Sequence, residues 1–74
     1  MITTEQRTVR IFYKIEKIKE TTGLKNTDIA ERMGVSWNTF NNLMSRMSKG
    51  FPPTVRMLDK IANALGVDIK IFFS

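Results

Sequence analysis

Hydrophobic residues recur at the spacing of a helix in four stretches of this chain, and short segments containing Gly or Pro separate these stretches. We predict a first helix from Thr3 or Thr4, either of which can cap it, to about Thr22, because Gly23 then allows the chain to turn. The residues expected on its inward side are Val9, Phe12, Ile15 and Ile18 or Lys19.

A second helix is predicted to begin at Asn26 or Thr27 and to run to Met33. Its core face repeats at i, i+1 and i+4, and consists of Ile29, Ala30 and Met33. Gly34 can take the left-handed conformation that ends a helix and turns the chain sharply. Val35 is then expected to fill the turn.

A third helix restarts at once, because Ser36 is placed as an N-cap whose hydroxyl can accept a hydrogen bond from a free amide. One of its faces is apolar and consists of Phe40, Leu43, Met44 and Met47. A second face carries Asn38, Asn41, Asn42 and Ser45, with Trp37 at its leading edge. Two helices that meet at one tight corner in this way have the spacing of a helix-turn-helix.

Pro52-Pro53-Thr54 predicts the start of a fourth helix. Proline favours an extended conformation of the residue before it, and Thr54 can cap a helix that begins directly after it. Its expected inward residues are Val55, Leu58, Ile61, Ala62 and Leu65, and Gly66 closes it. A chain of 74 residues has room for one small core. We therefore expect an all-α fold and a single domain over residues 1–74.

The asparagines of the third helix point to a function rather than to stability. Asparagine is a mediocre helix former, and each one costs the helix roughly half a kcal/mol relative to alanine. Three asparagines on one exposed face therefore suggest that their side chains have a use. The asparagine amide donates and accepts together, which matches the paired acceptor and donor of adenine in the major groove. A solvated polar face on an ordinary surface helix is the alternative.

The net charge of +5 is concentrated around the predicted turn. The stretch from Arg32 to Leu58 contains no Asp or Glu, and its four cations are Arg32, Arg46, Lys49 and Arg56. Such a local field attracts a polyanion such as DNA. A basic loop can also simply keep a small protein soluble, but that explanation does not predict cations flanking the amide-rich helix.

These features resemble the Cro and phage-repressor class of helix-turn-helix regulators, also called the xenobiotic-response-element family, from roughly Ile15 to Val67. The residues that carry the resemblance are Gly23-Leu24, Ile29-Ala30, Gly34-Val35-Ser36, Phe40, Leu43, Pro53 and Ala62-Asn63-Ala64-Leu65-Gly66-Val67. The resemblance implies a compact lambda-repressor-like domain of four to five helices. Its helix-turn-helix covers about 26–46, and its recognition helix, 36–46, lies in the major groove.

The resemblance also implies roles for individual positions. Base-edge contacts are expected from Trp37, Asn38, Asn41 and Asn42. Phosphate contacts are expected from Asn26, Ser36, Ser45, Arg46 and Lys49, and Asn26 matches a position that also braces the next side chain. Arg46, Ser48 and Lys49 are expected in the connection after the recognition helix, where the family generally touches the DNA backbone.

The chain departs from the family pattern in three respects. Met44 and Lys19 replace the Glu and Arg that often form an ion pair, and we expect an apolar contact in its place. The connection from Met44 to Pro53 is about three residues longer than is common. Trp37 is unusual at an exposed position: it can contact a sugar or a thymine methyl, anchor a protein partner, or be buried against the domain's own loop.

The tail from Val67 to Ser74 holds several apolar residues near a chain end. We expect it to pack partly on the first helix, as the family's short fifth helix does, and partly across the two-fold contact of a homodimer. A dimer would read two half-sites about one or more helical turns apart. An added strand is the other possibility for the tail.

Composition narrows the remaining classes of function. Without Cys or His, the chain lacks disulfides, thiol chemistry and the usual zinc ligands, so we expect no metal and no cofactor. Its Ser and carboxylate residues form no recognisable catalytic constellation, so we expect no enzyme. The longest apolar run is far below the roughly 20 residues that cross a membrane. We expect a cytoplasmic protein that binds double-stranded DNA, with no membrane or small-molecule partner.

Two functions therefore compete. The first is a sequence-specific transcriptional regulator, expected to be a repressor of phage or mobile-element type. The second is a protein-interaction module, such as an antitoxin or an anti-repressor, which holds a partner through Trp37 and the Phe residues of the tail.

Overall fold

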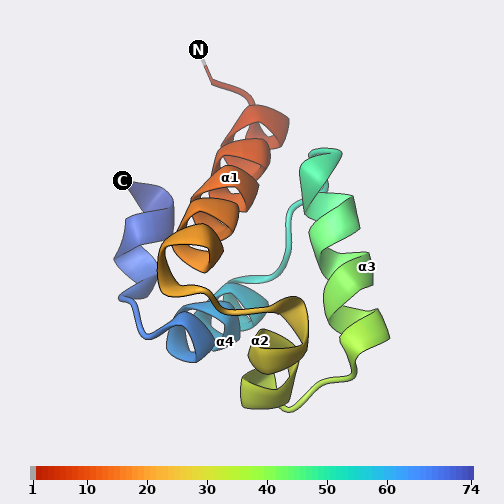
Figure 1. The fold of residues 1–74 in the computed structure, drawn as a ribbon. Helices are drawn as coiled ribbons and strands as arrows, with labels where there is room; N and C mark the ends of the chain where they lie inside the picture. Colours follow the sequence, from red (N-terminus) through yellow and green to blue (C-terminus); the bar gives the residue numbers. More distant parts are fainter. Residues whose placement is uncertain (1) are drawn as a thin grey trace.

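A computed structural model describes residues 2–74 of the chain as a bundle of four α-helices and a short 3₁₀-helix. Figure 1 shows their arrangement. In chain order they are α1 (Thr4–Thr22), α2 (Asn26–Met33), α3 (Trp37–Ser48), α4 (Val55–Leu65) and the 3₁₀-helix η1 (Ile69–Phe73). No strand occurs in this part of the chain. The all-α, lambda-repressor-like architecture predicted from the sequence is confirmed.

Side-chain caps start three of the α-helices. The hydroxyls of Thr3, Ser36 and Thr54 accept hydrogen bonds from main-chain amides three residues later, at 3.1 Å in each case. At the start of α2 the roles are reversed, because the Asp28 carboxylate accepts from the Lys25 amide at 2.9 Å. Each cap satisfies an amide that has no partner within its helix, which fixes where the helix begins.

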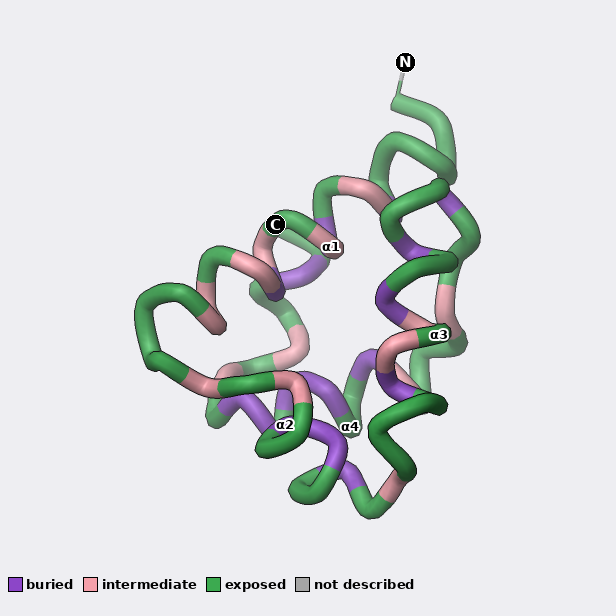
Figure 2. Tube along the Cα trace, turned by 45° about the vertical axis from the view of Figure 1, so that its right-hand side comes forward, coloured by how far each residue is buried: buried purple, intermediate pink, exposed green. Residues whose placement is uncertain are grey.

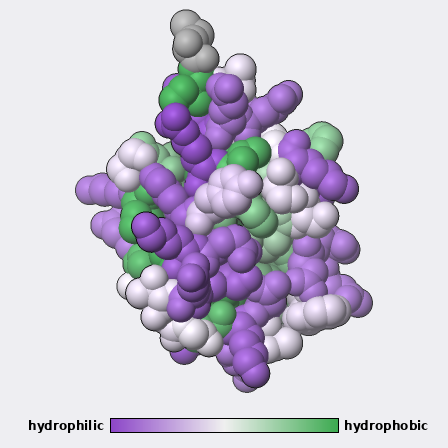
Figure 3. Space-filling model, turned by 45° about the horizontal axis from the view of Figure 1, so that its top comes forward, coloured by the Kyte–Doolittle hydropathy of each residue, from purple (hydrophilic) through white to green (hydrophobic). Residues whose placement is uncertain are grey.

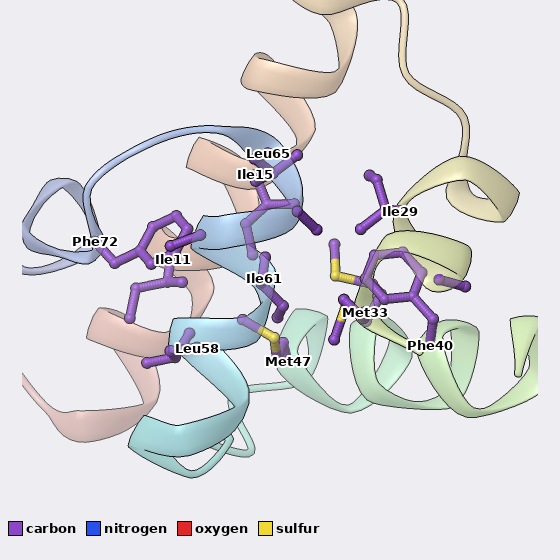
Figure 4. Packing of buried hydrophobic residues seen from close by; sticks show 14 residues of the cluster. Ile11, Ile15, Ile29, Met33, Phe40, Met47, Leu58, Ile61, Leu65 and Phe72 are labelled. Carbon is purple, nitrogen blue, oxygen red and sulfur yellow. The ribbon is translucent and has the colours of Figure 1, made fainter. Parts of the chain in front are cut away.

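The interior is built from one side of every helix, and burial along the chain follows the helical period in Figure 2. Its fully buried centre consists of Ile15, Ile29, Phe40, Met47 and Ile61. Figure 4 shows these side chains converging from the four α-helices. Close packing of this kind holds α2 and α3 at a fixed angle.

The inward stripe predicted for α1 was partly wrong. Ile15 is buried and Phe12 and Ile18 pack partly against the core, but Thr8 and Ile11 are buried where Val9 was expected. Thr8 can be buried because its hydroxyl donates to the Thr4 carbonyl at 2.9 Å.

Val55 was also wrongly predicted as a core residue of α4. It stands at the first position of that helix and is 66% exposed. The other four expected residues of α4 are buried, together with Ala64.

The tail forms η1, which packs on both α1 and α4, so the possibility of an added strand is excluded. Phe72 is buried and lies beside Ile11 (Figure 4). Lys14 fastens the end of the tail, because its ammonium donates to the main-chain oxygens of Ile71 at 2.8 Å and Ser74 at 2.7 Å. Among the described helices, none has the length and hydrophobicity needed to cross a membrane.

Candidate nucleic-acid interface

The corner between α2 and α3 is fixed by a glycine and two main-chain hydrogen bonds. Gly34 has a φ of 73°, a left-handed conformation that costs a residue with a Cβ roughly 1–2 kcal/mol. The Val35 amide donates to the Ala30 carbonyl and the Gly34 amide to the Glu31 carbonyl, both at 3.1 Å. Val35 then packs against the core, so the turn presents α3 at a fixed angle.

α3 is longer than predicted. The sequence placed its end near Arg46 and put Ser48 in the connection, whereas the helix continues to Ser48 and includes both residues. The extra length of chain before Pro53 is therefore mostly helix rather than loop. Met47, which is fully buried, anchors this added turn to the core.

The outer face of α3 carries the polar residues singled out from the sequence. Asn38, Asn42, Ser45 and Arg46 are exposed, and Lys49 at the helix end is exposed as well. Asn38, Asn42, Ser45 and Lys49 are three or four residues apart, and Arg46 follows Asn42 by four, along a helix of 12 residues that measures about 18 Å. The structure thus brings these predicted contacts together on one surface.

Trp37 is the first residue of α3 and is 53% exposed. The possibility that it is buried against the domain's own loop is therefore excluded. It stands at the end of the polar face nearest the turn, where an aromatic ring is available to a partner.

Asn41 differs from the other two asparagines of α3 because a neighbour already engages it. The Asn26 side-chain nitrogen Nδ2 donates to Asn41 Oδ1 at 2.9 Å, across the corner between α2 and α3. This is the bracing contact expected of Asn26. The Asn41 oxygen can still accept a second hydrogen bond, but the contact with Asn26 holds its amide in place, whereas no side-chain hydrogen bond of residues 2–74 holds Asn38 or Asn42.

The hydroxyl of Ser36 is likewise committed within the protein. It accepts from the Thr39 amide at 3.1 Å and lies 2.8 Å from the Thr39 hydroxyl. Amides of the first turn of α3, rather than this hydroxyl, remain available to an anion. At the other end of the face, the Ser48 hydroxyl donates to the Ser45 main-chain carbonyl at 2.6 Å, a contact that does not involve the Ser45 hydroxyl.

Phe51 belongs to this surface and was missed from the sequence. The guanidinium carbon of Arg46 lies 5.7 Å from the centre of the Phe51 ring, within the range of a cation–π contact. The helix ending brings the two together, because the Phe51 amide donates to the Arg46 carbonyl and the Gly50 amide to the Met47 carbonyl, each at 3.0 Å. Gly50, with a φ of 93°, was the signal that could have found the pair.

Phe51 differs from the residues that follow the ends of α2 and α4. Val35 and Val67 make the same type of main-chain hydrogen bond after α2 and α4, and both pack partly against the core. Phe51 instead stays 54% exposed and covers Arg46. Together with Thr39 and Asn42, these two residues line a shallow groove beside α3. The ring therefore holds a cation at the edge of the polar face.

Two further cations noted in the sequence serve the fold. Arg32 donates to the Ala64 carbonyl at 2.9 Å and so ties α2 to the end of α4. Lys19 pairs with Glu16 at 3.1 Å, and Met44 is buried in the core. These two positions therefore do not form the ion pair that is frequent in the family. Of the four cations between Arg32 and Leu58, Arg46 and Lys49 are those that border the face of α3.

Comparison with known proteins bears directly on this geometry. Residues 14–70 match the family of Cro/C1-type helix-turn-helix DNA-binding domains, and the match includes all of α2, α3 and α4. No curated protein sequence and no solved structure gives a significant match. Because the family covers most of the chain, its assignment does not depend on the turn alone. The chain belongs to the Cro/C1-type family of helix-turn-helix DNA-binding domains.

Proposed function

We propose that this protein is a sequence-specific transcriptional regulator that inserts α3 into the major groove of DNA. The observation that carries the proposal is the outer face of α3, where Asn38 and Asn42 are exposed with both halves of their amides free. Each can make the bidentate contact that distinguishes adenine from the other bases. Trp37, beside them, supplies apolar contact to a thymine methyl or a sugar.

Phosphate contacts at the borders of this face would fix the register of α3. Arg46 and Lys49 stand at its C-terminal end, and Ser45 lies between them and the asparagines. At the opposite end, the amides that open α2 and α3 supply donors beside Asn26 and Ser36. Contacts of this kind position a protein on the duplex without reading its sequence.

We further propose that the protein acts as a homodimeric repressor of phage or mobile-element type. Ile71 of η1 remains exposed and offers a place for a two-fold contact. A repressor needs only to occupy an operator, so a DNA-reading face and a dimer contact suffice for this activity. Two copies would read half-sites about one helical turn, or a multiple of it, apart.

The second candidate function is that of a protein-interaction module, and the exposure of Trp37 favours it. Tryptophan is enriched at the energetic centres of protein interfaces. An antitoxin or an anti-repressor would use the same scaffold but hold a protein through this ring. This alternative predicts that Trp37, and not the asparagines, determines binding.

The experiment that separates the two replaces the asparagines one at a time with alanine. Asn38→Ala and Asn42→Ala are each expected to lose about 1–3 kcal/mol of preference for the bound sequence over a mismatched one. Asn63→Ala is the matched control, because Asn63 is also an exposed helical asparagine but lies on α4. If all three variants discriminate between DNA sequences as the wild type does, the regulator proposal is wrong.

A further inference from the structure

A second groove, with a volume of about 520 Å³, lies along α1 on the side away from the proposed DNA-binding face. Its walls come from the first half of α1, the Pro52–Pro53 segment with the start of α4, and η1. In Figure 1, η1 and α3 lie on opposite sides of α1, and no residue of α3 lines the groove. A molecule held there would leave α3 accessible.

The groove has an apolar floor and apolar edges. Ile11, Leu58 and Phe72 are buried and lie at its base. Val55 of α4 and Phe73 of η1 also line the groove, and they are 66% and 60% exposed. The exposure of Val55, which the helical pattern of α4 did not predict, is thus part of a larger apolar surface.

Positive charge borders this apolar surface. Arg7, Arg10 and Lys14 line the groove and share one face of α1, because they are three and four residues apart. No Asp or Glu side chain lines it. In residues 2–74 the only salt bridge is that between Lys19 and Glu16, elsewhere on α1, so the two arginines have no carboxylate partner.

Lys14 has a different role from the two arginines. Its ammonium holds the main-chain oxygens of Ile71 and Ser74, and thereby fixes η1 as the wall that carries Phe73. The hydrogen bonds from Lys14 thus help to form one wall of the groove. Arg7 and Arg10 are the two cations of the groove that remain free.

We propose that this groove binds an acidic segment of a partner protein, with apolar side chains spaced between its carboxylates. Phe73 and Val55 would receive the apolar side chains, and Arg7 and Arg10 would pair with the carboxylates. Figure 3 shows hydrophobic side chains reaching the surface as separate patches among hydrophilic ones.

Charge selects this partner over a second copy of the chain and over DNA. A two-fold contact across the groove would place the arginines of one copy against those of the other, which is repulsive. Duplex DNA would satisfy the arginines but offers no apolar side chains for Val55 and Phe73. An acidic amphipathic segment satisfies both parts of the surface.

The test measures binding of a fluorescent peptide that carries Leu or Phe at i, i+3 and i+7 and Glu at the positions between. The double variant Arg7→Gln/Arg10→Gln is expected to bind it about tenfold more weakly than the wild type, which corresponds to about 1.4 kcal/mol. Lys17→Gln/Lys60→Gln is the matched control, because it removes two exposed cations that lie outside the groove.

A second pair of variants tests the apolar part. Phe73→Ala is expected to weaken peptide binding, whereas Tyr13→Ala, which removes an equally exposed aromatic ring outside the groove, is not. All six altered residues are exposed, so helical content measured by circular dichroism should stay at the wild-type level.

Three results would overturn the proposal. The first is a peptide affinity that is absent or equally affected by the groove variants and their controls. The second is a loss of random-sequence DNA binding in Arg7→Gln/Arg10→Gln as large as the loss of peptide binding, which would make the arginines DNA contacts. The third is a wild-type dimer that Phe73→Ala converts to a monomer in sedimentation, which would assign the groove to a second copy.

Discussion

The contact between Arg46 and Phe51 gives a quantitative prediction for DNA binding. The ring lies 5.7 Å from the guanidinium carbon, and both side chains are exposed, so the contact is worth about 0.5–1 kcal/mol. We expect Phe51→Leu to weaken DNA binding about two- to fivefold, because the arginine then loses the surface that holds it in place. Leucine keeps an apolar residue after the helix ending, so the fold should be retained.

The dependence of affinity on salt distinguishes the two residues. If Arg46 contacts a phosphate as proposed, Arg46→Gln is expected to make the negative slope of log K against log salt concentration shallower by about 0.9. Phe51→Leu leaves the charge in place and is expected to leave the slope unchanged. Fluorescence anisotropy with a labelled duplex, measured between about 50 and 200 mM salt, resolves this difference.

The double variant Arg46→Gln/Phe51→Leu completes a double-mutant cycle. In the Arg46→Gln background, Phe51→Leu should have almost no effect, since there is no longer a guanidinium for the ring to position. Equal losses from Phe51→Leu in both backgrounds would show that the ring contacts DNA directly or stabilises the fold. Such a result would rule out a role for the ring through Arg46.

Three other substitutions test the fold and the proposed reading face. Gly34→Ala should lower the free energy of unfolding by about 1 kcal/mol in a denaturant titration, because no neighbouring atom blocks the methyl group and only the left-handed backbone resists it. Phe72→Ala should cost about 3–5 kcal/mol, enough to unfold much of the protein, while Phe73→Ala should be nearly neutral; equal costs would contradict the described packing of η1. Asn42→Ala should raise the free energy of unfolding by roughly 0.5 kcal/mol while weakening sequence-specific binding, and a stability loss would show that Asn42 serves the fold.

The helices and the corner between α2 and α3 were predictable because their signals are local. Gly34 and Ser36 are adjacent in sequence to the turn that they create, and each acts through backbone conformation or a hydrogen bond within three residues. The core faces of α2 and α3 follow from the helical period alone. For these elements, the hydrophobic pattern and the capping residues agree with each other.

The errors occurred where burial depends on distant parts of the chain. Thr8 and Ile11 are buried in place of Val9 because α3 and η1, which follow later in the chain, decide which side of α1 is covered. Val55 continues the apolar face of α4 but stands at the first position of that helix, where it is 66% exposed. Periodicity identifies a helix face but cannot tell how far its partners reach.

In the proposed site, too, local features were predictable from the sequence and contacts between distant residues were not. The sequence placed Asn38, Asn41 and Asn42 on one face, but it could not show that Asn26 donates a hydrogen bond to Asn41, 15 positions away. It also could not show that α3 continues to Ser48, which carries Arg46 out of the connection and under the ring of Phe51. Contacts of this kind depend on three-dimensional angles that residue types alone do not specify.

Whether α3 reads DNA sequence is best decided by selecting bound duplexes from a random pool at near-physiological salt and sequencing the survivors. We predict a recovered motif with adenines at the positions opposite Asn38 and Asn42, arranged as two inverted half-sites. Loss of that motif's enrichment with Asn38→Ala, but not with Asn63→Ala, would tie it to α3. A pool with no enriched sequence, or DNA retained only at low salt, would show that α3 is not a sequence reader.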